Sequence, residues 1–123
     1  MQKVFLVEDS PLVRERLNEL LGTVPDTRIV GHASTAEAAI VGILADRPDV
    51  VLLDLRLAQG SGFDVLRAVR GSAPEIDFYM LSNYASDPYR QLVERLGARG
   101  YVDKSKDFER VRAIIAERAA GRN

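Results

Sequence analysis

The sequence has no cysteine and no long hydrophobic run. Without cysteine the chain has neither disulfides nor thiolate metal ligands, which fits a reducing compartment. No apolar stretch approaches the roughly 20 residues that span a bilayer. The opening residues, MQKVFLV, are too short for the apolar part of a signal peptide and lead straight into acids. We therefore expect a soluble, cytoplasmic protein that does not enter a membrane.

The chain also lacks a marked excess of charge of either sign. It has 17 Lys and Arg against 18 Asp and Glu, which gives a net charge of −1. Nucleic acid binding depends on clustered positive charge, so we expect no direct nucleic acid contact by this domain. The 123 residues are 46% hydrophobic. This length and composition predict one domain, residues 1–123, with a core of its own.

Strand-like and helix-like segments alternate along the whole chain. Strands are predicted at 3–7, 28–33, 49–54, 76–82 and 100–103, and helices at 10–22, 34–46, 62–70, 87–97 and 107–118. Helix caps are predicted at Ser10, at Ser34 in a capping box with Glu37, at Asp87 and at Asp107. Five strand–helix pairs in this order predict an α/β fold, a doubly wound parallel sheet with helices on both faces.

Polar side chains follow the apolar runs. The residues placed just after or at the ends of the strands are Glu8, Asp9, Asp54, Ser82, Asn83 and Lys104. In a parallel sheet these positions meet at one edge, where ligands bind. An Asp or Ser after a strand often caps the next helix instead, and a lysine is usually on the surface. Other residues in these loops are better placed as caps, so a shared site is the stronger interpretation.

The chemistry of this set is specific. Three carboxylates close together repel one another and need a cation, and oxygen ligands of this kind suit Mg²⁺. Asp54 would remain able to attack phosphorus. Lys104 would place a positive charge on phosphoryl oxygens, and Ser82 would donate a hydroxyl. The sequence therefore predicts a site for phosphoryl transfer.

Five motifs carry a resemblance to a known family. They are VEDS, VVLLDLRL, GSGFDVLRAVR, YMLSN and GARGYVDKS, and Asp54 precedes Ser82 by 28 residues and Lys104 by 50. In this order and spacing the chain resembles, over essentially its whole length, the receiver domain of two-component response regulators in its single-domain form. The resemblance implies a flavodoxin-like (βα)5 fold with strand order 2-1-3-4-5.

The resemblance also implies roles. Asp54 would be the phospho-acceptor, taking a phosphoryl group from a histidine kinase or phosphotransfer protein, with Lys104 and Ser82 completing the catalytic set. Mg²⁺ would be held by Glu8, Asp9, Asp54 and the main-chain carbonyl of Arg56. Ser82 and Tyr101 would form the switch, although Tyr101 could instead be a half-buried strand aromatic. The domain would be a phosphorylation switch that assists its own Mg²⁺-dependent phosphorylation and dephosphorylation, not an enzyme.

Some residues depart from the family pattern. Asn83 stands where alanine is frequent, and Ser105 follows the lysine where proline is frequent, which could change how Lys104 is aimed. The resemblance implies that Arg56 and Tyr84 occupy positions that flank the path of the water that hydrolyses the phosphoryl bond. We hypothesise that they restrict it and lengthen the life of the phosphorylated state, unless both are ordinary surface residues. The glycine-containing loop 58–62 is expected to be mobile.

The resemblance implies an unidentified downstream protein, or a second copy of the chain, on the face of the last two helices, with candidates Tyr89, Arg90, Val93, Tyr101 and Arg112. A phosphorylation-independent docking or dimerisation module is the main alternative. An aspartate-based phosphatase would need a second acid where Arg56 stands. The single histidine, His32, is expected to pack or lie on the surface.

Overall fold

A computed structural model describes residues 1–83 and 87–121, with residues 87–89 described by their backbone alone. Five strands alternate with five helices in this described part of the chain: β1 Gln2–Val7, α1 Pro11–Leu21, β2 Thr27–Ala33, α2 Ala36–Asp46, β3 Val50–Asp54, α3 Gly62–Arg70, β4 Asp77–Ser82, α4 Asp87–Arg95, β5 Gly100–Asp103 and α5 Arg110–Gly121. The strands form one parallel sheet in the order β2-β1-β3-β4-β5, which confirms the predicted topology.

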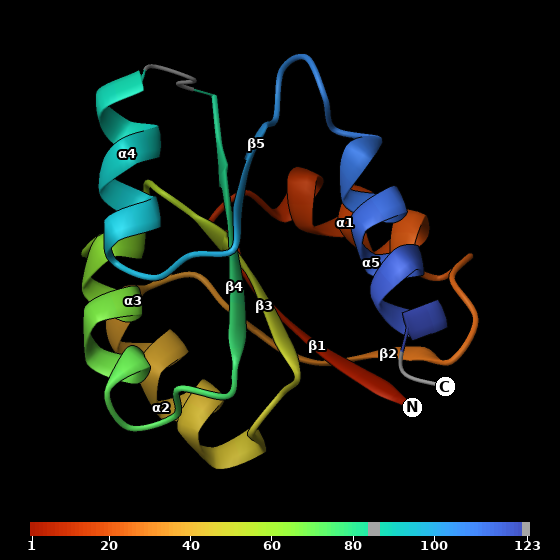
Figure 1. The fold of residues 1–123 in the computed structure, drawn as a ribbon, viewed down its shortest axis with the longest axis horizontal. Helices are drawn as coiled ribbons and strands as arrows, with labels where there is room; N and C mark the ends of the chain where they lie inside the picture. The colour runs from red at the N-terminus through yellow and green to blue at the C-terminus, as the bar shows by residue number, and fades with distance from the viewer. Residues whose placement is uncertain (84–86, 122–123) are drawn as a thin grey trace.

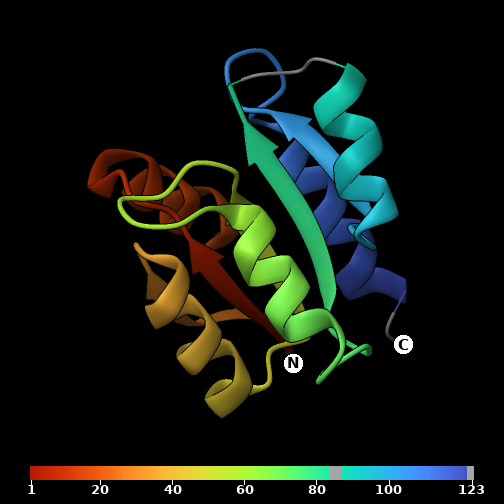
Figure 2. The same ribbon diagram turned by 90° about the vertical axis from the view of Figure 1, so that its left-hand side faces the viewer.

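The sheet separates two layers of helices. Helices α1 and α5 cover one face, and α2, α3 and α4 cover the other (Figure 1; Figure 2). Side chains alternate between the faces along each strand. Beneath α1 and α5, one core cluster includes Val4, Leu6, Val50, Leu52, Leu17 and Ile115. On the opposite face, the second includes Phe5, Val7, Val51, Leu53, Ile43 and Val65. All five residues of β3 are therefore buried, with Asp54 at the end of the strand.

One predicted helix cap is wrong by a single residue. The cap of α2 is Thr35, whose hydroxyl accepts a hydrogen bond from the backbone N–H of Ala38, and not Ser34. The reason lies outside the helix. The carbonyl of Ser34 accepts a hydrogen bond from the backbone of Ala58, 3.2 Å away. The chain therefore stays extended through Ser34, and the helix begins later.

The start of the last helix was also predicted wrongly, three residues early. Residues 107–109 form turns whose carbonyls accept from the N–H groups three residues ahead, beginning with Asp107 and Arg110 at 2.9 Å. Since α5 begins at Arg110, Asp107 does not precede it as a cap. Ser10 caps α1 as predicted, and the side chain of Asp87 lies outside the described part.

The loop between β3 and α3 is tied to the loop before α2. The N–H of Ala36 donates to the carbonyl of Gln59 at 2.9 Å, alongside the bond from Ala58 to Ser34. Gly60 has a φ of 78°, which only glycine adopts easily. The structure thus shows how this loop is held, and its expected mobility stays a prediction. Within the ranges 1–83 and 87–121, no helix combines the length and apolarity needed to cross a bilayer.

Candidate functional site

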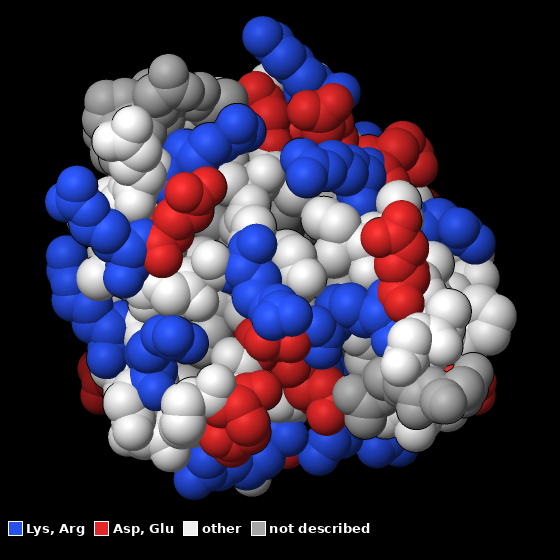
Figure 3. Space-filling model, in the orientation of Figure 1, with Lys and Arg blue, Asp and Glu red and all other residues white. Residues whose placement is uncertain are grey.

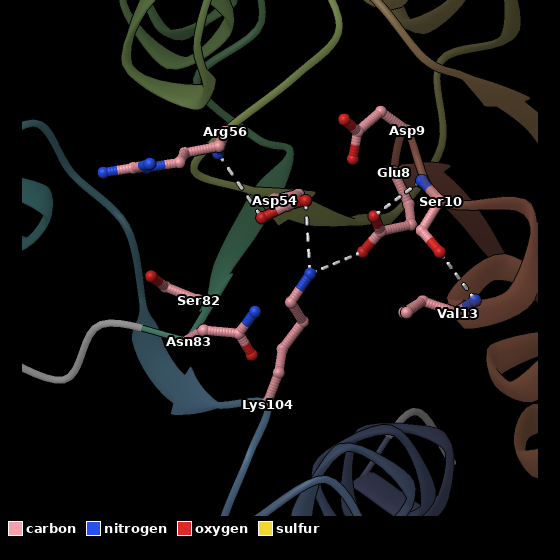
Figure 4. A pocket seen from close by; sticks show the side chains of 9 residues that line it. All are labelled: Glu8, Asp9, Ser10, Val13, Asp54, Arg56, Ser82, Asn83 and Lys104. Carbon is pink, nitrogen blue, oxygen red and sulfur yellow. Dashed lines mark hydrogen bonds and ion pairs between the residues drawn. The ribbon is translucent and has the colours of Figure 1, made fainter.

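A pocket opens at the carboxyl end of the sheet, between the ends of β1, β3, β4 and β5 (Figure 4). The residues that line it are Glu8, Asp9, Ser10, Val13, Asp54, Arg56, Ser82, Asn83 and Lys104. The structure therefore brings together the five residues singled out at the strand ends for phosphoryl chemistry. Ser10 and Val13, from the start of α1, complete one wall of the pocket. The sequence pattern indicated only a role in the helix for these two residues.

Lys104 joins the two buried carboxylates across the pocket. Its Nζ lies 2.9 Å from Oε1 of Glu8 and 3.2 Å from Oδ2 of Asp54 (Figure 4). The side chain of the lysine is 10% exposed, so water screens this pairing little. Burial lowers the pKa of Lys104, but the hydrogen bond to Glu8 and the charge of Asp54 outweigh it and raise the pKa. The ammonium therefore stays charged at neutral pH.

Glu8 is held from two sides. Its Oε1 accepts from Lys104, and its Oε2 accepts from the backbone N–H of Ser10 at 3.0 Å. Burial raises the pKa of Glu8, yet these two hydrogen bonds outweigh it and the pKa is lowered. Glu8 is therefore a buried anion at neutral pH, and both of its carboxylate oxygens already accept hydrogen bonds.

Asp54 is the carboxylate whose ionisation is most affected. Burial, and then the negative charge of Glu8, raise its pKa to about 7, with Lys104 opposing them. The backbone N–H of Arg56 contributes a long contact of 3.4 Å to Oδ1. At neutral pH Asp54 is therefore partly protonated in the absence of a further cation, and a cation at this site would favour its ionised form.

A third carboxylate completes an acidic cluster. Asp9 is exposed at the edge of the pocket, and carboxylate oxygens of Asp9, Glu8 and Asp54 lie within 4.8 Å of one another. These are hard oxygen ligands with open space beside them, which is the donor set that Mg²⁺ accepts. The residues therefore fit a divalent cation.

The backbone around Asp54 is closely packed. The N–H of Leu55 donates to the carbonyl of Leu81 at 3.1 Å, and the N–H of Gly62 donates to the carbonyl of Leu55 at 2.9 Å. A Cβ added at Gly62 would lie 2.5 Å from the carbonyl oxygen of Asp54. The start of α3 thus presses directly on the end of β3, and glycine is required there.

Ser82 and Asn83 form the wall contributed by β4. Ser82 is 1% exposed and pairs in register with Asp103 of β5, and its carbonyl accepts from the N–H of Lys104 at 2.8 Å. Asn83 is exposed and lines the pocket. The hydroxyl residue and the lysine are therefore joined through one backbone hydrogen bond.

The other described residues named from the sequence lie outside the acidic cluster. Arg56 is exposed and its side chain extends away from the acidic cluster (Figure 4), while Tyr84 lies outside the described residues. Tyr101 is 4% exposed, so it is fully inside and not half-buried. The guanidinium of Arg90 lies 5.5 Å from the centroid of its ring. His32 is exposed, which confirms one of the expected placements.

Two of the residues predicted to contact a partner on the face of the last two helices are placed elsewhere. Val93 is fully buried in the core, so it cannot contact a partner. Arg112 donates from Nε to the Thr23 hydroxyl at 2.7 Å, which places it on the side of α1. The side chain of Tyr89 lies outside the described part.

Known proteins are similar to this chain in sequence and in fold. The family model for the response regulator receiver domain matches residues 4–116. Among curated relatives, the DNA-binding transcriptional activator DevR/DosR of Mycobacterium tuberculosis is 39% identical over 93% of this chain and 53% of its own length. The response regulator UvrY of Escherichia coli O157:H7 is 30% identical over 94% of this chain and 53% of its own length. The chain thus spans about half the length of these relatives.

Solved structures of response regulators have the same fold. The receiver domain of the putative response regulator NarL from Mycobacterium tuberculosis superposes with a TM-score of 0.84 and 30% identity, covering 98% of this chain and 97% of that one. A LuxR-family response regulator from Aurantimonas gives 0.89 with 28% identity, covering 97% and 85%. The chain belongs to the response regulator receiver domain family. It is homologous to the receiver domains of phosphorelay response regulators.

Proposed function

We propose that this chain accepts a phosphoryl group on Asp54 and acts as a phosphorylation switch, with residues 1–123 as one receiver domain. The observation that carries the proposal is the buried ammonium of Lys104, held 2.9 Å from Glu8 and 3.2 Å from Asp54 at the mouth of a pocket that also holds Asp9. Such a set positions a carboxylate nucleophile beside a fixed positive charge, which is most of what phosphoryl transfer requires.

The arrangement of the site supports a covalent transfer to Asp54. An ionised oxygen of Asp54 attacks the phosphorus of a phosphohistidine on a kinase or phosphotransfer protein. The new P–O bond forms as the P–N bond breaks, and the electron pair of that bond remains on the imidazole nitrogen. The product is an acyl phosphate. Lys104 then interacts with a phosphoryl oxygen instead of the free carboxylate, and Ser82 donates its hydroxyl to another.

Mg²⁺ is the proposed cofactor. Glu8, Asp9, Asp54 and the main-chain carbonyl of Arg56 are its proposed ligands. When bound, it supplies charge neutralisation for the carboxylates and the phosphoryl oxygens. Both oxygens of Glu8 already accept hydrogen bonds from Lys104 and Ser10, so Asp9 and Asp54 are the main direct donors in this proposal.

Phosphorylation would shift an equilibrium between two states, with Ser82 and Tyr101 as the switch. The surface that reads it would surround Tyr101, where Arg90, Glu94, Arg99 and Arg110 line a hollow. Figure 3 shows charges of both signs mixed over this face, which carries α4, β5 and α5. Mixed charge suits a protein partner, a downstream protein or a second copy of this chain, better than direct nucleic acid contact. The proposed setting is the cytoplasm, away from membranes.

The test is to incubate the protein with acetyl phosphate and Mg²⁺ and to measure the intact mass. The expected result is a gain of one phosphoryl group that is lost in Asp54→Asn and in a chelated sample. If neither acetyl phosphate nor beryllium trifluoride, an acyl phosphate mimic, engages Asp54, the chain would instead be a phosphorylation-independent docking module.

A further inference from the structure

The loop that carries Lys104 is fastened by the two residues beside it. Oδ1 of Asp103 accepts from the Ser105 hydroxyl at 2.6 Å and from the Ser105 N–H at 2.9 Å. The backbone carbonyl of Asp103 also accepts from the N–H of Asp107 at 2.8 Å. We call the pair of bonds from Ser105 to the Asp103 carboxylate the 103–105 clamp.

Asp103, the acceptor of the clamp, is held in place by the sheet. Asp103 ends β5, is 7% exposed, and lies in register with Ser82 of β4. The hydrogen bond from the Ser105 hydroxyl holds the pKa of Asp103 below its usual value, so the acceptor stays ionised and the bond charge-assisted. Ser105 itself is exposed, so its side chain fills no core volume. The contribution of its hydroxyl is therefore the hydrogen bond to Asp103 and not packing.

Lys104 needs such support because its side chain is long and flexible. Four rotatable bonds separate the backbone from an ammonium that must sit between Glu8 and Asp54. The N–H of Lys104 is fixed to the carbonyl of Ser82, and the clamp fixes the residues on both sides. The direction in which the side chain leaves the loop is thereby set.

We propose that Asp103 and Ser105 are positioning residues that aim the Lys104 ammonium at the reacting carboxylate through the 103–105 clamp. This inference rests on the proposed role of Lys104 in phosphoryl transfer. A lysine whose loop has lost the clamp still reaches the pocket, but its ammonium spends less time between Glu8 and Asp54. Small misplacements of a catalytic charge slow a reaction strongly.

The first variant is Ser105→Ala, which removes the hydroxyl and keeps the backbone bond. We expect phosphorylation by acetyl phosphate to slow by roughly 5- to 50-fold, with the same final mass gain and an unchanged thermal midpoint. Ser105→Thr, which keeps the hydroxyl, should remain near the unaltered rate. Thr23→Ala is the control, because the Thr23 hydroxyl is also hydrogen-bonded, donating to the carbonyl of Leu20 and accepting from Nε of Arg112, far from the pocket.

A double-mutant cycle separates positioning from a general effect. In a Lys104→Ala background, Ser105→Ala should cause no further slowing, because the group it aims is gone. Equal rates for Ser105→Ala and the unaltered protein would overturn the inference and leave the proposed function standing. Additive slowing in the Lys104→Ala background would overturn it as well.

A second readout does not depend on phosphorylation. In the unaltered protein, the hydrogen-bonded ammonium protons of Lys104 should exchange slowly in NMR spectra, and in Ser105→Thr they should do the same. Loss of that signal in Ser105→Ala supports the clamp, and its persistence overturns the inference. If the unaltered protein accepts no phosphoryl group at all, the proposed function fails, and this signal still decides whether the clamp holds Lys104.

Discussion

At the scale of single residues, the chemistry of the site depends on where charge is buried. Residue types and strand ends were enough to predict that Glu8, Asp9, Asp54, Ser82 and Lys104 would share one edge of the sheet, and the structure brings them into one pocket. The sequence could not show that the pKa of Asp54 is raised to about 7, because that depends on burial and on its distance from Glu8.

The raised pKa of Asp54 has a consequence for stability. In the unfolded chain an aspartate ionises near its ordinary pKa of 3.8, but in the fold Asp54 ionises only near 7. The unfolded state therefore releases this proton first. The fold is weakened as pH rises from the lower value to the higher, and below the lower value the penalty is absent.

We therefore expect Asp54→Asn to stabilise the metal-free protein at about pH 8 and to have little effect near pH 4. The expected rise in thermal midpoint at the higher pH is about 3–8 °C, or about 1–2 kcal/mol for a chain of this size. Thermal melts in chelator across this pH range measure it. A variant that is less stable than the unaltered protein at the higher pH would contradict the electrostatic account.

Arg56 carries a second prediction at this scale. Its exposed side chain lines the pocket and extends away from the acidic cluster (Figure 4). The hypothesis is that it nevertheless restricts the water that hydrolyses the phosphoryl bond. We expect Arg56→Ala to shorten the life of phosphorylated Asp54 by roughly three- to tenfold, about 1 kcal/mol in the barrier. Tyr84→Ala tests the same hypothesis at a residue outside the described part. Phosphate release that is already fast, and unchanged in both variants, would end the idea.

At the scale of helices and strands, local signals explain most boundaries and long-range bonds explain the exceptions. The start of α3 follows from a capping box between Ser61 and Asp64, which both residue types allow at that spacing. The start of α2 was misjudged because Ser34 bonds to a loop more than twenty residues away. Nothing local in the sequence shows such a partner.

Helix α5 is held at its far end by Arg118. Its guanidinium donates to Oδ2 of Asp77 at 2.5 Å and to Oε1 of Gln2 at 2.9 Å, and Gln2 is fully buried. We expect Arg118→Met, which keeps the apolar stem, to lower the free energy of unfolding by about 2 kcal/mol, because charged hydrogen bonds are lost and Gln2 is left without this donor.

The matched control is Arg99→Met. Arg99 pairs with the same Asp77, at 3.7 Å, but its side chain is 59% exposed. An exposed pair contributes at most about 1 kcal/mol, so this variant should stay close to the unaltered protein. Urea denaturation of both variants measures the difference. Equal losses of stability would mean that the buried anchor of α5 contributes nothing beyond an ordinary surface ion pair.

At the scale of the whole molecule, the regular alternation of strands and helices was enough to predict a parallel sheet with helices on both faces. The strand order came from the family resemblance, and the structure confirms it. Contacts between the two ends of the chain were beyond prediction. Gln2 and Arg118 meet because β1 lies inside the sheet and α5 packs across it, a consequence of the complete fold.

The proposed function requires that Asp54 is the residue that accepts the phosphoryl group. The most direct measurement is to phosphorylate the protein with acetyl phosphate and Mg²⁺, reduce the acyl phosphate with borohydride, and locate the reduced residue by peptide mass spectrometry. We predict homoserine at position 54, none when Mg²⁺ is removed, and far less after the same brief exposure when Lys104 is changed to alanine. A mass gain whose reduced residue lies elsewhere, at Asp9 for example, would contradict the account.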